Sequence, residues 1–159
     1  MNKYKKYKII YKSLNDVMDI ISINFIPEII IKKTKYIIQN PSVMGYYTRI
    51  NNIPYIILNP DLFKFNKKVI KKSIYHEIGH YIHDYYFQFV PQYLPRKHHG
   101  NPDYYCNTNQ KESFATAFAD LIYFHKKGKI QKIKNSKRLS KLYNILDNSN
   151  LITKNAMLI

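Results

Sequence analysis

The sequence predicts an α+β fold, in which a small antiparallel or mixed sheet packs against helices. Between residues 28 and 58, runs of β-branched and aromatic residues alternate with turn residues, as in short strands. From residue 66 onward, apolar residues recur every three or four positions, as in amphipathic helices. The 159 residues, 45% of them hydrophobic, are enough for one domain over 1–159 with its own core. We expect its parts in this order: an N-terminal helix and sheet (1–60), two long helices (66–127) and a C-terminal helix (136–148).

The N-terminal region predicts one helix and one strand. Ser13 is a residue type that caps helix N-termini, and apolar residues follow it at helical spacing, so a short helix is expected to begin there. The β-branched run over residues 28–38 then predicts a strand that is closed by Asn40 and Pro41.

Two further strands, over residues 43–50 and 53–58, are predicted to form a hairpin. Asn51 and Asn52 between them are compatible with the backbone of a tight turn. Pro54 has no N–H to donate to a neighbouring strand, so the second strand of the pair is expected at an edge of the sheet.

The rest of the chain predicts helices separated by one irregular segment. A long helix is expected over residues 66–86, and a second over residues 110–126 that Gly128 ends. The proline- and asparagine-rich residues 88–110 predict a loop between them. A last helix is expected over residues 137–147.

The charge of the chain is strongly positive. Lys and Arg number 26 against 10 Asp and Glu, a formal net charge of +16. Such an excess favours attraction to acidic substrates, nucleic acid or anionic surfaces. Lysines gather at the start of the first long helix and again over residues 126–138. For both clusters we expect a solvated face, with an acidic protein or nucleic acid as the alternative partner.

Cysteine usage and the search for targeting segments exclude further classes of protein. The single Cys106 excludes an intrachain disulfide and a zinc cluster built from cysteines. No signal-peptide core and no membrane span are predicted, because polar residues interrupt every apolar run. A cytoplasmic location is the default expectation, with delivery by a non-standard route as the alternative. The pattern predicts no oligomeric state.

The first long helix carries the motif that points to chemistry, His76-Glu77-Ile78-Gly79-His80. Residues four apart on a helix share one face, so both imidazoles can bind the same Zn²⁺. Glu77 lies a step round the helix, where it can act as general base on a metal-activated water. Two surface histidines on an amphipathic helix are the alternative interpretation.

A catalytic zinc site needs a third protein ligand, and Glu112 is the strongest candidate. It opens the second long helix, 32 residues after His80, behind a loop long enough to bring the two helices together. The alternative is an acid that offsets the helix dipole. Asp103 is a reserve ligand. His83 is too far along the helix to share a metal with His76, so we expect it on the surface or behind the ligands.

The residues around these positions resemble a known family. The motif from His76 to His80, together with Tyr105-Cys-Asn-Thr-Asn-Gln-Lys-Glu112, is similar to the gluzincin endopeptidases related to the catalytic domain of anthrax lethal factor. The resemblance extends from the predicted hairpin to the helix near Leu146. It implies a zincin-like metalloprotease domain, with a small sheet packed against a metal-binding helix and a second ligand-bearing helix.

The resemblance also implies a role for each residue. His76, His80 and Glu112 would bind one Zn²⁺ per chain, and Glu77 would be the general base. Tyr105 would donate its phenol to the oxyanion, with its neighbour Tyr104 as the competitor. With 16 tyrosines in the chain, composition alone favours a packing role for either.

One position departs from the family pattern. Four residues after the ligand glutamate, lethal-factor-like and thermolysin-like enzymes have a carboxylate that orients an imidazole, whereas this chain has Thr116. Asp120 and Asp84 are the alternatives for that role. Substrate capture in zincins resembles strand addition to a sheet edge, which we expect at residues 53–58. Tyr46, Tyr47 and Tyr55 are candidates to line the cleft, although ordinary packing is the favoured interpretation for each of them.

The sequence thus predicts a zinc-dependent endopeptidase that acts on a peptide or protein substrate. One alternative is a zincin that cleaves a DNA-bound or regulatory protein, which the basic charge favours. A second is a non-catalytic basic binding protein with a structural zinc.

Overall fold

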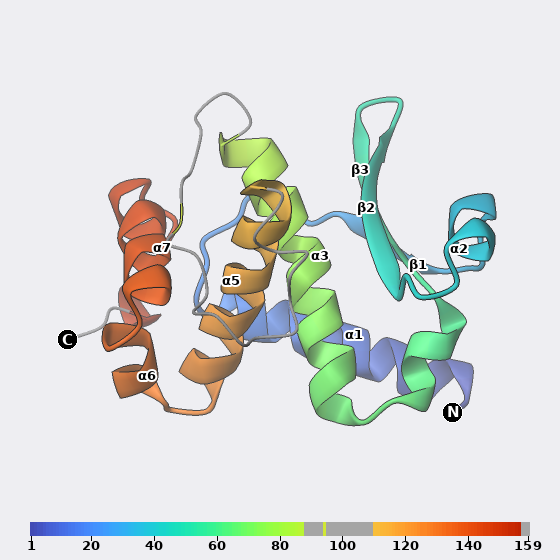
Figure 1. The fold of residues 1–159 in the computed structure, drawn as a ribbon, viewed down its shortest axis with the longest axis horizontal. Coiled ribbons are helices and arrows are strands. Elements are labelled where there is room, and N and C mark those ends of the chain that lie inside the picture. The colour runs from blue at the N-terminus through green and yellow to red at the C-terminus, as the bar shows by residue number, and fades with distance from the viewer. Residues whose placement is uncertain (88–93, 95–109, 157–159) are drawn as a thin grey trace.

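The computed structural model describes residues 1–87, 94 and 110–156 and has the small α+β fold that the sequence predicts (Figure 1). In the described part of the chain, no helix is both long enough and apolar enough to cross a membrane. The elements are α1 (Lys3–Met18), β1 (Glu28–Ile31), α2 (Lys35–Gln39), β2 (Gly45–Ile50), β3 (Ile53–Leu58), α3 (Lys67–Phe87), α5 (Gln110–Lys126), α6 (Ile130–Lys134) and α7 (Lys137–Asn148), with 3-10 turns at Pro60–Lys64 and Lys154–Ala156.

The sheet is mixed, and its strand order is β1-β3-β2. β3 pairs in parallel with β1 and antiparallel with β2, so the predicted edge position of residues 53–58 is wrong. Pro54 is tolerated in this central strand because the β1 ladder begins only at Tyr55, one residue further on. The predicted turn is confirmed: Asn51 and Asn52 have positive φ angles of 51° and 64°, as a tight hairpin turn requires.

The first helix begins ten residues earlier than Ser13. Asn2 caps α1 by accepting a hydrogen bond from the backbone N–H of Lys5. Ser13 lies within the helix, where its hydroxyl donates to the carbonyl of Ile9. The earlier turns are helical because Ile10 extends the apolar stripe that packs on the core.

The predicted strand over residues 28–38 is also wrong beyond Ile31. The chain leaves the sheet there and forms the short helix α2, whose N-cap is Thr34. The side chain of Thr34 accepts from the N–H of Ile37, and Ile37 is buried. Threonine suits both a strand and a helix cap, so local composition favoured the wrong element here.

The later helices lie where they are predicted, within one residue at each end for α3 and α7. Asn66 caps α3 by accepting from the N–H of Val69, and Ser136 caps α7. Gly128, with a φ of +65°, ends α5, and the next N–H bonds back to the carbonyl of Phe124. The short helix α6 between them was not predicted.

Helix α3 lies between the sheet and α5, with α1 crossing behind it (Figure 1). Gly79 sets the distance between α3 and α5, since a Cβ atom there would lie 2.9 Å from the Cα of Ala115 and 3.1 Å from its carbonyl oxygen. Fully buried rings fill the space around this crossing: Tyr75, Tyr81, Phe114 and Phe118. The close approach brings the side chains of the two helices within bonding distance of each other.

Candidate metal centre

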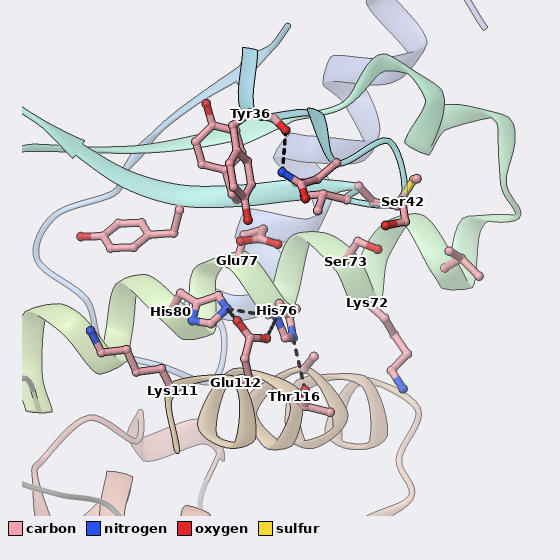
Figure 2. Close-up of a pocket in the computed structure, with 18 of the residues that line it drawn as sticks. Tyr36, Ser42, Lys72, Ser73, His76, Glu77, His80, Lys111, Glu112 and Thr116 are labelled. Carbon is pink, nitrogen blue, oxygen red and sulfur yellow. Dashed lines mark hydrogen bonds and ion pairs between the residues drawn. The ribbon is translucent and has the colours of Figure 1, made fainter. Parts of the chain in front are cut away.

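Three side chains from α3 and α5 meet in one cluster (Figure 2). The Nε2 atoms of His76 and His80 lie 3.1 Å apart, and each lies 3.1 Å from an oxygen of Glu112. One donor atom from each residue falls within 4.8 Å of the others, so the group can hold a metal ion. The predicted convergence of these three residues is therefore confirmed.

The two helices run antiparallel, which explains how residues so distant in sequence meet. Contacts pair Lys72 with Asp120 and Gly79 with Ala115, so positions rising along α3 face positions falling along α5. Glu112, in the first turn of α5, consequently faces the two histidines, which are one turn apart on α3.

The donor set fits a transition metal such as zinc. Tetrahedral zinc with bonds of about 2.0–2.1 Å needs ligand atoms roughly 3.3 Å apart, close to the observed 3.1 Å. Burial acts to raise the pKa of Glu112, but the contacts with His76 and His80 outweigh it and hold the pKa well below its usual value. Glu112 thus stays ionised, as a metal ligand must.

Thr116 contacts His76 from behind the cluster, a position for which the sequence left three candidate residues. Its Oγ1 lies 3.4 Å from Nδ1 of His76, on the ring side opposite the cluster (Figure 2). The two predicted alternatives have cationic partners, with Asp120 against Lys72 and Asp84 against Arg49. Of these three residues, Thr116 is therefore the one that contacts the back of His76, and it offers a neutral oxygen.

Glu77 points the other way, toward the sheet (Figure 2). Its side chain is buried, and its Oε2 has no hydrogen-bond partner in the described part of the chain. Burial raises its pKa to about 7, an effect that the nearby Glu112 increases and that His80 and a hydrogen bond from the Tyr47 backbone oppose. Glu77 is thus a carboxylate that can gain or lose a proton near neutral pH.

Strand β2 forms the wall above Glu77. A Cβ at Gly45 would lie 3.3 Å from Cγ of Glu77, so glycine permits the close approach of the strand. Because β3 is the central strand, residues 53–58 have no free edge for the strand addition that the sequence predicts there, whereas β2 (residues 45–50) is an edge strand of the sheet. Beyond Glu77, the hydroxyl of Tyr47 donates to Asp84 at 2.7 Å, which ties β2 to α3.

An open cleft of about 1320 Å³ lies between this wall and the two helices. The candidate ligands and Glu77 all line it, as do Tyr46 and Tyr47, whereas Tyr55, the third tyrosine named from the sequence, does not. Glycine and tyrosine in a strand are ordinary residues, so sequence alone offered no signal that Gly45 and the Tyr47 backbone serve Glu77.

The other predicted residues fall into two groups. His83 is not on the surface: it is buried, and its ring lies 5.0 Å from that of Phe114 on α5. Tyr105, its competitor Tyr104 and the reserve ligand Asp103 lie outside the described residues. The role of Tyr105 stays a prediction.

The fold and the site together define an α+β chain with a candidate metal centre of two histidines and one glutamate. The chain matches no protein-family model, no curated protein and no solved structure. The likeness to lethal-factor-like gluzincins therefore remains a prediction from the sequence, and the function has to be argued from the geometry of the site.

Proposed function

We propose that the chain is a zinc-dependent endopeptidase of gluzincin type, with one Zn²⁺ held by His76, His80 and Glu112. The observation that carries the proposal is Glu77, a buried carboxylate beside the three proposed ligands, with an oxygen that has no hydrogen-bond partner among the described residues. A purely structural metal site gains nothing from such a group, because an unsatisfied buried charge opposes folding. A hydrolase needs it as a base.

The chemistry is divided between the metal and the protein. Zinc, when bound, polarises a carbonyl group and makes water more acidic. Oε2 of Glu77 accepts a proton from the attacking water and then delivers it to the nitrogen of the leaving amine. The backbone N–H of Tyr47 donates to the same carboxylate and holds its orientation during both transfers. The phenol of Tyr105 would donate to the oxyanion, a contribution of roughly 3 kcal/mol.

The substrate backbone is proposed to lie along β2. An edge strand has unpaired N–H and C=O groups on its outer side, and an extended peptide can bond to them. β2 borders the cleft from Gly45 to Tyr47, directly above the proposed base. A peptide in this position would place its carbonyl between Glu77 and the metal ligands.

The first test is the zinc content of the purified protein. We expect about one zinc per chain in the wild type and in Glu77→Gln, and a sharp fall in Glu112→Ala, which removes a ligand. Peptide-library cleavage by wild type, absent in Glu77→Gln, would complete the test. A wild type that takes up no zinc on reconstitution would overturn the proposal and leave a basic binding protein.

A second candidate shares the mechanism but differs in substrate, and the net charge of +16 favours it. Here the protein cleaved is bound to DNA, and the basic surface brings the enzyme to it. DNA retention that falls steeply with rising salt supports this candidate, because each phosphate contact releases counterions. An absence of retention at low salt excludes it.

A further inference from the structure

One face of α3 continues from the metal centre as a row of lysines. Lys68, Lys72, His76 and His80 follow one another at intervals of four residues, so they share a face of the helix. Each interval spans about 6 Å along the axis, which puts Lys72 about 6 Å and Lys68 about 12 Å from His76. Both lysines line the same cleft as the candidate ligands, and Figure 2 shows Lys72 on the same helix as His76.

These two lysines bring more positive charge than their neighbours neutralise. Lys72 pairs with Asp120 at 2.5 Å, and both ammonium groups lie over the ring of Tyr123, at 5.7 and 5.9 Å from its centroid. In the part of the chain that the structure describes, no carboxylate lies within ion-pair distance of Lys68. One end of the cleft therefore presents a cation over an aromatic ring, ready for an anionic group.

The remaining charges of the cleft do not offset this cation. Among the described residues that line it, the acids are Glu77 and Glu112, and both belong to the candidate metal centre. A peptide in the cleft thus meets a positive potential on leaving the metal centre, and cleft walls strengthen such a field.

We propose that the site selects acidic peptides, with Asp or Glu placed on the side of the scissile bond that faces the N-terminus of α3. This inference rests on the proposed function and deepens it by naming the substrate class. An extended peptide advances about 3.3 Å per residue, so side chains two to four residues from the scissile bond reach Lys72 and Lys68. Peptide is favoured over nucleic acid because the edge of β2 offers main-chain partners on the facing wall.

The test is a binding measurement that does not depend on turnover. Zinc-treated Glu77→Gln protein is titrated with two pools of dye-labelled, capped decapeptides, and fluorescence anisotropy reports Kd. The pools are identical except that one carries three consecutive Glu residues and the other three Gln. The same titrations use Lys68→Glu and, as the matched control, Lys67→Glu, each made in the Glu77→Gln background.

The Lys67→Glu control separates the effect of a lysine that lines the cleft from the effect of the overall net charge. Lys67 and Lys68 are both exposed residues in the first turn of α3, but Lys67 does not line the cleft. Both substitutions change the net charge and the helix-end electrostatics equally. We expect the Glu pool to bind about tenfold more tightly than the Gln pool, a preference that Lys68→Glu abolishes and Lys67→Glu largely retains.

The outcomes keep the two proposals apart. Equal affinity for the pools, or an equal loss in both lysine variants, overturns the acidic selection. Cleavage of a peptide library by wild type without enrichment of Asp or Glu also overturns it, while the peptidase proposal stands. An acidic preference lost only in Lys68→Glu, without cleavage by wild type, supports the selection and refutes the peptidase. A single-stranded DNA oligomer that binds more tightly than the Glu pool and depends on Lys68 would reassign the cleft to nucleic acid.

Discussion

Two buried carboxylates of this molecule lie in opposite electrostatic situations. Asp16 on α1 accepts hydrogen bonds from Lys71 and Tyr75 at 2.5 and 2.6 Å, and Lys126 lies 3.7 Å away. Glu77 is about equally buried, with 7% of its surface exposed against 6% for Asp16, yet its Oε2 has no partner in the described chain. The fold thus pairs the carboxylate of Asp16 with cations, whereas Oε2 of Glu77 keeps no hydrogen-bond partner among the described residues.

The pKa values of the two groups move in opposite directions for this reason. Burial acts to raise both, and for Glu77 it prevails and raises the pKa to about 7. For Asp16, the bonds from Lys71 and Tyr75 outweigh burial and lower the pKa. Full pairing fits a structural role for Asp16, which joins α1 to α3 and α5, whereas an oxygen without a partner among the described residues fits the proposed role of Glu77 as a base.

The largest expected effect comes from Glu77→Gln, which removes the proposed base and keeps its shape. Peptide cleavage should fall by about 10²–10⁴-fold, the usual contribution of general acid–base catalysis. Stability should stay the same or rise, since a neutral amide costs less to bury than a carboxylate with one oxygen that has no partner among the described residues. Measurements of kcat and Tm on the same preparation test both statements. Retained cleavage, or a large loss of stability, would show that Glu77 is structural.

The matched change Asp16→Asn should have the reverse outcome. It removes a charged acceptor from two hydrogen bonds and leaves Lys71 without its counter-ion, so unfolding should become easier by about 2 kcal/mol. Zinc content and the kcat of the folded enzyme should not change. Urea unfolding and metal analysis would check this, and a variant as stable as wild type would contradict the assigned role of Asp16.

The pH dependence of stability should test the structural role of Asp16. The folded-state pKa of Asp16 is lowered, so its contribution is present above the unfolded pKa near 4 and is lost as pH falls through the folded value. The gap in unfolding free energy between wild type and Asp16→Asn should therefore be largest at neutral pH and shrink in acid. Urea titrations between pH 3 and pH 7 would measure it. A gap that is constant with pH would refute the charge-based explanation.

The smallest effect is expected at Thr116, which supports a ligand from behind. Thr116→Val keeps the shape and removes the oxygen that lies 3.4 Å from His76. Zinc affinity should fall by about tenfold, the low end for loss of such a partner, with little change in Tm. Competition with a zinc-binding dye would measure the affinity. Thr116→Ser, which restores a hydroxyl, should recover it, and failure to do so would assign the loss to packing.

Local physical chemistry accounts for what could be predicted about this protein. Histidines four apart on a helix share a face wherever that helix lies, so the pairing of His76 and His80 follows from spacing. The turn at Asn51 and Asn52 and the end of α5 at Gly128 follow equally from backbone preferences. Glu112 could be predicted as the third candidate ligand because the chain has few other glutamates that could take that role.

Tertiary structure decided the features that depend on pairing between distant segments. Strand propensity does not specify neighbours, so only the fold shows that β3 is central and that β2 forms the edge above Glu77. Likewise, Thr116 meets His76 and Lys72 meets Asp120 because α3 and α5 approach closely at Gly79 and run antiparallel. Spacing along one helix brings two candidate ligands together, but the third candidate ligand, the contact behind His76 and the charge of the cleft require two helices in register.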